Sequence, residues 1–405
     1  MSFVLKVMTL NCWGLPLPYP IGSKDRLRRI QAIGKRLAGD NYDIVALQEI
    51  WSLEDYEMLR SMVSKVLPYG FYFHSGLLGS GVCILSKGEI VDTLMHRYSL
   101  NGYPHHVHRG DWFGGKVVGM ARIHYKNINI CSYVTHIHAE YDRDSDLYLP
   151  HRVVQAFEMS QFVKATSGGA DVTLLMGDFN FEPTDLGYRL VLSNAQLKDA
   201  WACRKDGIEH DIDEGNTCDI PSNSYACTEA LERWPKGKRI DYIMYDSRAD
   251  VTLNPVKVFT DFHRIPPTDD INYSDHEAVV AVFDGTVKSE NINLRLQRPF
   301  SEDRSSLLSE AISIIDDGMG KVYTDRIYYS FAVLVLGILF FYTLDLELSY
   351  PKIAALVIAL RFVITLIIGF CLVTGVIMHS MEWKALEAAK QGIKVLLQQL
   401  APSAT

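Results

Sequence analysis

The sequence predicts an α/β sandwich over residues 1–284, followed by a membrane hairpin in the C-terminal third. Within residues 1–284, short apolar runs typical of strands alternate with amphipathic segments typical of helices. A polar and charged stretch follows at 285–326, and two long apolar runs come after it. The 405 residues are enough for one large domain and a tail.

The predicted elements of the domain follow from hydrophobic spacing. Runs rich in apolar and β-branched residues predict strands at 3–10, 43–48, 82–86, 117–124, 128–135, 172–177, 240–245 and 277–283. Helices are predicted at 24–37, 53–66 and 147–164. Leu27, Ile30, Ile33 and Leu37 recur at helical spacing in the first helix, and Pro150 falls in the first turn of the third, where proline is tolerated.

The two C-terminal apolar runs are predicted to be transmembrane helices. Residues 327–344 contain no charge, and residues 353–378 contain only Arg361. At about 1.5 Å per residue, each run is long enough to cross a bilayer. The alternative is a pair of buried core helices, but a helix of a soluble protein rarely lacks a polar face, and these runs have none. We therefore predict two transmembrane helices within 327–378, a juxtamembrane linker at 285–326 and a tight turn at 345–352.

Charges around the hairpin predict its orientation. Basic residues lie on both outer flanks: Lys321 and Arg326 before the first run, and Lys384, Lys390 and Lys394 after the second. By the positive-inside rule, the domain and both termini are expected in the cytosol. With Arg361 at the luminal interface, the uncharged cores span about 27 Å and about 25 Å, which fits the endoplasmic reticulum or another thin internal membrane. Alternatively, Arg361 faces a lipid headgroup or a partner helix.

The last segment, 379–405, is predicted to be a cytosolic amphipathic tail. Its apolar residues fall on one helical stripe: Trp383, Leu386, Ile393, Leu397 and Leu400. We expect this stripe to lie on the membrane surface or against the N-terminal domain.

Composition narrows the class of protein further. The net charge of −8 argues against a protein that holds nucleic acid by charge. The seven cysteines are odd in number and show no Cys-x-x-Cys, so reduced cytosolic thiols are expected. Residues 1–13 lack the features of a signal peptide and are better explained by a first strand.

Polar side chains recur where the predicted strands end. They are Asn11, Glu49, His136, Asp178, Asn180, Asp241, Asp275 and His276. Carboxylates, an aspartate–asparagine pair and an aspartate–histidine pair are the groups that metal-assisted hydrolysis of a phosphoester requires. Mg²⁺ prefers oxygen ligands and keeps several waters, so Glu49 is the predicted ligand, and Asn11 adds an amide oxygen directly or through water.

The remaining groups have predicted roles in proton transfer and substrate binding. His276 has the right ordinary pKa for a general base, and Asp241 is the carboxylate expected to fix its tautomer. Asp178 and Asn180 point the same way on an extended backbone, so they are expected to hold the attacking water and a phosphoryl oxygen.

His136 is predicted to donate a hydrogen bond to a phosphoryl or leaving oxygen. His138 shares its face and is the alternative, although we favour a structural role for it. His105, His106 and His108 suggest zinc at first sight, but no cysteine lies near and a polar loop is favoured.

Residues 110–116 match half of a phosphate-binding loop, G-x4-G-K. The next residue is Val117 where that loop needs Ser or Thr, and a strand rather than a helix is expected to follow. Nucleotide binding is therefore rejected. Asp111 and Lys116 are expected to act as a charged pair at the rim of the cleft.

Together these motifs resemble the endonuclease/exonuclease/phosphatase superfamily, also called DNase I-like. The matching residues are Asn11, Glu49, Thr135-His136, Gly177-Asp178-Phe179-Asn180, Arg239-Ile240-Asp241-Tyr242 and Ser274-Asp275-His276, in the family's order and spacing. The resemblance covers residues 1–284 and implies a four-layer sandwich of two mixed β-sheets flanked by helices.

Other motifs are similar to those of the animal neutral sphingomyelinases of type 1. These motifs are residues 10–14 (LNCWG), 100–104 (LNGYP), 110–113 (GDWF), 135–141 (THIHAEY) and the two C-terminal apolar runs. The resemblance implies Mg²⁺-dependent cleavage of sphingomyelin to ceramide and phosphocholine, with sphingomyelin and membrane lipids as partners. It also implies that Asp111 and Lys116 match an aspartate and lysine proposed to act as a switch.

Alternative functions stay open at this point. A lyso-choline phospholipid presents the same phosphocholine diester as sphingomyelin. An inositol-phosphate phosphatase or a nuclease uses the same fold, but the clustered Lys and Arg that such substrates require are not evident. A scaffold with a dead site requires a lost catalytic residue, and none is lost. Tyr103 and Trp112 are guesses for aromatic contacts to choline.

Overall fold

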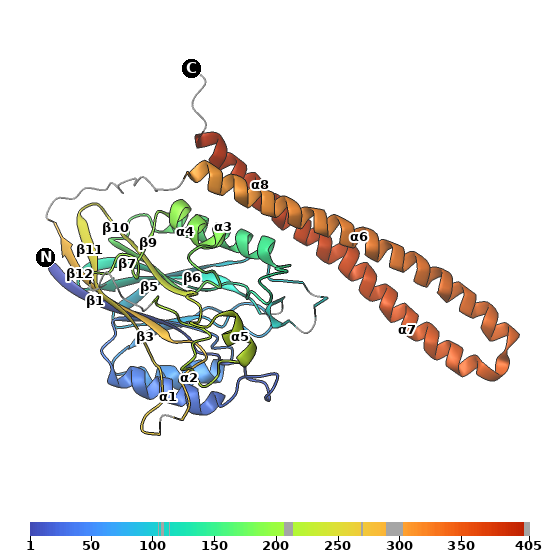
Figure 1. Cartoon of the computed structure of the whole chain (residues 1–405), viewed down its shortest axis with the longest axis horizontal. Coiled ribbons are helices and arrows are strands. Elements are labelled where there is room, and N and C mark those ends of the chain that lie inside the picture. Colours follow the sequence, from blue (N-terminus) through green and yellow to red (C-terminus); the bar gives the residue numbers. More distant parts are fainter. Residues whose placement is uncertain are drawn as a thin grey trace, which may run out of the picture.

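The computed structural model describes residues 1–103, 105–106, 109–112, 114–205, 214–268, 270–288 and 303–400. Two six-stranded mixed sheets stack face to face, and helices cover both outer faces (Figure 1). In spatial order, the first sheet contains β11 (Val251–Asp261), β12 (Ala278–Val287), β1 (Ser2–Asn11), β2 (Ile44–Gln48), β4 (Cys83–Ser86) and β3 (Tyr69–Tyr72). The second contains β5 (Glu89–Arg97), β6 (Val117–Tyr125), β7 (Ile128–His136), β8 (Val172–Asp178), β10 (Asp241–Ser247) and β9 (Lys198–Asp199).

Apolar side chains between the sheets hold the two sheets together. Alternate residues of β1, such as Leu5 and Val7, face Ile130, Val134 and Met176 of the second sheet in one buried cluster. Central strands that are buried on both faces read as nearly continuous apolar runs, which is why the sequence predicts them well.

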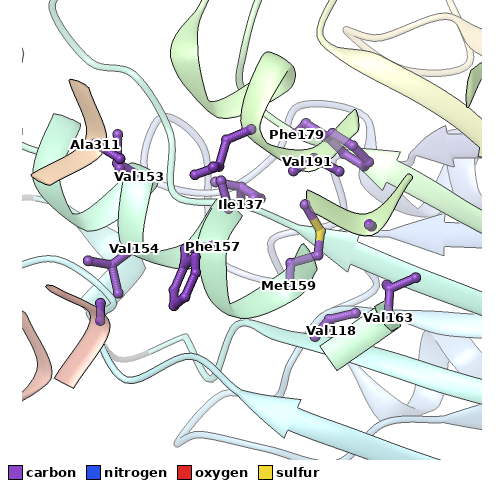
Figure 2. Packing of buried hydrophobic residues seen from close by; sticks show 14 of the residues in the cluster. Val118, Ile137, Val153, Val154, Phe157, Met159, Val163, Phe179, Val191 and Ala311 are labelled. Atoms are coloured by element: carbon purple, nitrogen blue, oxygen red, sulfur yellow. The ribbon is translucent and has the colours of Figure 1, made fainter. Parts of the chain in front are cut away.

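Helices complete the four layers that the family resemblance implies. α1 (Arg26–Gly39) and α2 (Leu53–Val63) cover the first sheet, with Ile30, Ile33 and Leu59 buried against it. α3 (Leu149–Thr166) and α4 (Leu186–Ala195) cover the second, where Phe157 and Val191 belong to another cluster (Figure 2). Two short helices, η1 (Gly110–Trp112) and α5 (Thr228–Arg233), lie in the connections.

A long helical hairpin extends from one side of the domain (Figure 1). It consists of α6 (Arg304–Ser349), the turn η2 (Pro351–Ile353), α7 (Ala354–Leu372), the π-helical segment η3 (Val373–Met378) and α8 (His379–Leu400). The apolar windows of both arms are long enough to cross a membrane and are mostly unburied. Arg361 of α7 pairs with Glu347 of α6, and its Nε lies 3.3 Å from Thr343 Oγ1. Arg361 therefore contacts the other helix of the hairpin, and its predicted position at the luminal interface stays a prediction.

The structure corrects the predicted linker. Residues 285–288 complete β12 and the residue after it, 289–302 lie outside the described residues, and from Arg304 onward the chain is helical. Leu307, Ala311 and Ile315 recur at helical spacing and pack on α3 and α4, and Ala311 lies beside Val153 in Figure 2. The polar composition of this segment hid its apolar stripe. The predicted turn is also shorter, because α6 continues to Ser349.

The amphipathic tail packs on the domain, which decides between the two predicted positions. Leu386 and Ile393 of α8 are fully buried in the cluster that includes α3. The hairpin therefore packs on the domain at two places, the start of α6 and α8.

Candidate active site

The strand ends that carry the predicted site residues meet at one end of the sandwich. In the first sheet, β1 and β2 are parallel and Asn11 pairs with Gln48, so Glu49 follows beside Asn11. In the second sheet, β7 and β8 are parallel and His136 pairs with Asp178. Strand β10 runs antiparallel to β8 and places Asp241 opposite Asp178. The register of these strands gathers groups that are distant in the sequence.

Backbone geometry at this end requires unusual conformations. Gly177 has a φ of 150°, and a Cβ there would lie 2.0 Å from the carbonyl oxygen of Thr135, so only glycine allows this approach of β8 to β7. Glu49 and Asn180 adopt φ values of 57° and 48°. Left-handed conformations at residues other than glycine concentrate at functional sites, where the surroundings hold the strain.

Asn11 connects the two sheets at the centre of the site. Its Nδ2 donates to Glu49 Oε1 at 2.9 Å and to Asp178 Oδ2 at 3.0 Å. The backbone N–H of Asn180 donates to Asp178 Oδ1 at 2.9 Å. The carboxylate of Asp178 is thereby fixed by one donor from β1 and one from the loop after β8.

His276 and Asp241 form the predicted histidine–carboxylate pair. The two groups lie 2.8 Å apart, His276 Nδ1 to Asp241 Oδ2, and Thr217 Oγ1 donates to the same oxygen at 2.6 Å. With Nδ1–H donated to Asp241, the Nε2 of a neutral ring is free to accept a proton. Burial lowers the pKa of His276, but Cys218 and Asp241 outweigh it and the net pKa lies well above the ordinary value.

The floor of the site is rich in acids. Burial raises the pKa of Asp178 to about 7, with a further contribution from the charge of Asp241. Burial and the neighbouring Asp275 likewise raise the pKa of Glu49, and burial raises the pKa of Asp275. Converging buried carboxylates with raised pKa values are a site where a cation is favourable. Among the described residues, the ligand atoms of Asp178, Asp241 and His276 also lie within 4.8 Å of one another.

Lys116 and Asp111 form a charged pair, but it is buried in the wall of the site rather than at an exposed rim. Lys116 is 1% exposed, and its Nζ lies 2.6 Å from Asp111 Oδ1. Lys116 Nζ also donates to the carbonyl of Ile137 at 2.8 Å and lies 3.1 Å from His136 Nε2. Burial, followed by the charge of Lys116, holds the pKa of His136 well below its ordinary value. The neutral ring then accepts from Lys116 at Nε2, so Lys116 carries the positive charge at this wall.

A cavity of about 660 Å³ joins these groups. Of the predicted site residues, those lining it are Asn11, Glu49, Asp111, Lys116, His136, Asp178, Asn180, Asp275 and His276, and Asp241 lies behind His276. His138 does not line it. Its ring stacks on Tyr148 at 4.3 Å, which agrees with the structural role favoured for it.

The guesses for choline contacts are not supported. Tyr103 is buried among Tyr148 and His151, and neither it nor Trp112 lines the cavity. Among the described residues, the aromatic side chains that do line it are Trp13, Trp51 and Tyr141.

Sequence reasoning also missed supporting residues. Arg29 donates to the carbonyls of Cys12 and Trp13 at 2.8 and 2.6 Å and so holds the loop after β1. Thr217 belongs to a connection with no periodic pattern, and nothing in the sequence marks it. Trp51 follows Glu49 by two residues, and this spacing could have predicted that Trp51 lies beside Glu49 at the site. His105 and His106 lie among aromatic rings, and His108 lies outside the described residues.

A four-layer sandwich with acids, an asparagine and a histidine–aspartate pair at one end defines a hydrolase of phosphoesters. The profile described as "Endonuclease/Exonuclease/phosphatase family" matches residues 8–276. A putative neutral sphingomyelinase of Caenorhabditis elegans is 44% identical, over 97% of this chain and 91% of its own. Sphingomyelin phosphodiesterase 2 of Homo sapiens is 41% identical, over 69% of this chain and 64% of its own.

A solved structure supports the fold. The beta toxin of Staphylococcus aureus, in a mutant with bound magnesium ions, superposes with a TM-score of 0.51 at 22% identity, covering 69% of this chain and 99% of its own. The chain belongs to the endonuclease/exonuclease/phosphatase family and, within it, to the neutral sphingomyelinases.

Proposed function

We propose that this chain is a membrane-anchored, Mg²⁺-dependent phosphodiesterase of the phospholipase C type, which hydrolyses sphingomyelin to ceramide and phosphocholine. The observation that carries the proposal is the convergence of Glu49, Asp178 and the His276–Asp241 pair around one cavity. The names of the two relatives support the substrate class.

The donor set fits a hard divalent cation. Glu49 and Asn11 offer oxygen atoms at the floor of the cavity, beside Asp275 and Asp178, whose charges are only partly balanced by protein cations. Glu49 and Asn11 would hold the ion, which when bound neutralises phosphate charge and stabilises the leaving oxygen. The magnesium ions in the superposed beta toxin agree with this choice.

The protein groups perform the proton transfer. Asp178 is placed to hold the attacking water, and the Nε2 of neutral His276 takes its proton while Asp241 stabilises the resulting imidazolium. The water oxygen bonds to phosphorus and the bond from phosphorus to the ceramide oxygen breaks. Lys116 and His136 line the same cavity. We assign the positive charge of Lys116 to the negative charge that develops on the phosphoryl and leaving oxygens, and we assign His136, whose Nε2 accepts from Lys116, to holding that ammonium group in place rather than to the donor role predicted for it. A cation bound among the carboxylates would lower the raised pKa of His276 by repelling the charge of the imidazolium. The fraction of His276 in the neutral, basic form is therefore expected to depend on whether the cation is bound.

The C-terminal hairpin supports a lipid substrate. We assign residues 1–284 to the catalytic domain, the apolar parts of α6 and α7 to transmembrane helices, and α8 to a cytosolic helix docked on the domain. Both termini then lie in the cytosol, in the endoplasmic reticulum or another internal membrane. Anchoring raises the effective concentration of the cavity at the surface where the phosphodiester lies.

The decisive experiment offers the purified full chain several substrates in mixed micelles with Mg²⁺. Sphingomyelin is expected to be cleaved. A lyso-choline phospholipid, an inositol phosphate and a DNA duplex serve as alternatives, and faster hydrolysis of any of them would overturn the assignment. His276→Ala should abolish turnover and leave lipid association intact, whereas the control His124→Ala, at an exposed histidine of β6, should not affect turnover. Loss of lipid association in His276→Ala would instead favour a scaffold.

A further inference from the structure

Large apolar side chains are exposed on two loops beside the mouth of the cavity. The loop between β1 and α1 exposes Leu17, Tyr19 and Ile21, and the loop between β3 and β4 exposes Leu77 and Leu78. We name these five residues the apolar collar. Tyr19, Ile21 and Leu77 are 68%, 75% and 82% exposed, which is costly for side chains that stay in water. Leu17, Ile21 and Leu78 also line the cavity, so the collar is continuous with the site.

The first loop is built to leave few polar groups unsatisfied. Residues 13–23 contain no acidic residue, lysine or arginine, and the prolines 16, 18 and 20 have no N–H to satisfy. The N–H groups of Ile21 and Gly22 donate to the carbonyl of Pro18 at 3.0 and 2.9 Å. The two ends of the loop are joined by the N–H of Leu15, which donates to Ser23 Oγ at 2.8 Å. Internal hydrogen bonds of this kind lower the cost of moving a loop from water into the surface of an apolar medium.

The second loop matches the first in charge. Residues 74–83 also contain no acidic residue, lysine or arginine. The loop is held against the site by the hydrogen bond from Gly115 N to Gly79 O, at 3.0 Å. The collar therefore consists of two uncharged loops, each held by hydrogen bonds, at the mouth of the cavity. The carboxylates of the site lie deeper in the cavity.

The position of the collar relative to the hairpin indicates its partner. The dark blue loop after β1 projects on the side of the domain toward which the hairpin extends (Figure 1). We propose that the collar enters the surface of the same bilayer that α6 and α7 span, so that the cavity opens directly onto lipid headgroups. The inference rests on the anchoring in the proposed function. It adds a second membrane contact, through which the lipid substrate enters without crossing water.

The first experiment measures depth and does not require turnover. In a full chain with Cys203→Ser and Cys227→Ser, which removes the exposed thiols, Leu77→Cys carries a bimane label in phosphatidylcholine–sphingomyelin vesicles. A spin-labelled lipid in these vesicles should quench the label at position 77. The control is Val91→Cys on β5, which is 54% exposed and does not line the cavity. Quenching at 77 no stronger than at 91 would overturn the proposal.

The second experiment measures the catalytic consequence. Tyr19→Ser with Leu77→Ser changes collar residues that do not line the cavity. Hydrolysis of sphingomyelin in vesicles should fall on the order of tenfold, because part of the apolar contact is lost. Hydrolysis of water-soluble p-nitrophenyl phosphocholine should be unchanged, as should both rates in Val91→Ser. Equal loss on both substrates would contradict the collar.

The two proposals fail separately. Quenching at position 77 in a protein that cleaves no sphingomyelin would refute the proposed function and leave the collar supported. Cleavage of sphingomyelin without that quenching would refute the collar alone.

Discussion

Replacing Asp241 by Asn tests whether this carboxylate orients the catalytic base. Asp241 Oδ2 lies 2.8 Å from His276 Nδ1 and 2.6 Å from Thr217 Oγ1, whereas Oδ1 has no hydrogen-bond partner among the described residues. Asn can therefore place its oxygen at the Oδ2 position and its amide nitrogen at the Oδ1 position, or the reverse. The two orientations have different consequences for the rate.

With the amide oxygen toward His276, the tautomer is preserved and only the charge-assisted hydrogen bond to the imidazolium is lost. That bond is worth about 1.5–3 kcal/mol, which corresponds to roughly a ten- to hundredfold lower kcat. With the amide nitrogen toward His276, the neutral ring is protonated at Nε2 and cannot act as the base, which costs about 10⁴-fold. The expected loss in kcat for D241N thus lies between these limits, with little change in KM.

The assay is Mg²⁺-supported hydrolysis of p-nitrophenyl phosphocholine by the full chain, with the melting temperature as a check of the fold. The matched control is Asp246→Asn, at a buried aspartate of the same strand beyond the site. A D241N enzyme with a kcat within about threefold of wild type would refute the orienting role, since the smallest loss derived above is roughly tenfold.

Three further outcomes are expected. Glu49→Gln should raise the Mg²⁺ concentration at half-maximal activity about 10- to 100-fold and leave the metal-free melting temperature equal or higher, because a buried acid with a raised pKa is removed; an unchanged Mg²⁺ requirement would reassign the ligand. Asp111→Asn should destabilise the protein by about 3–5 kcal/mol in thermal melts at neutral pH, because its buried lysine partner loses the paired carboxylate. Burial raises the pKa of Asp111, but the charge of Lys116 outweighs it, so the pKa is lowered in the folded protein. The stability that the ionised carboxylate contributes is therefore present above the unfolded pKa of about 4 and is lost progressively below it. The melting temperatures of wild type and Asp111→Asn should converge in acid, and a difference that does not change with pH would argue against the ion pair. Ile393→Ala should loosen the docked α8 by about 2–4 kcal/mol and increase its hydrogen exchange, whereas Val395→Ala, on the exposed face of that helix, should not; equal exchange in both would argue against docking.

The sequence predicts the central strands and fails at the edges for physical reasons. The eight predicted strands are present because their residues are buried on one or both faces and read as apolar runs. The missed strand β5 is an edge strand whose residues are exposed or half-buried, and its apolar residues come in pairs instead of alternating with polar ones. The missed strand β11 contains Pro255 at a register shift, which an edge tolerates and a sequence rule penalises.

The same distinction holds for the site. Glu49, Asp178 and His276 could be predicted because functional groups at strand ends meet wherever the register of the strands brings them together. The burial of Lys116 against His136 could not, because it depends on packing between distant segments. The apolar collar was missed for another reason: exposed apolar residues in proline-rich loops have no periodicity to detect.

Because α6 is one continuous helix, it bears on how lipid substrate would reach such an enzyme. A helix of 46 residues extends about 69 Å and passes without interruption from the domain into the apolar run. Helix α8 packs on the same domain, so the hairpin is held to the domain at two places. If its apolar runs span a membrane as proposed, the domain would keep the tilt of the hairpin and could not turn toward another vesicle or organelle. Each molecule would then consume only the lipids that diffuse laterally to it, and its output would be limited by lipid traffic into its own membrane rather than by any movement of the enzyme.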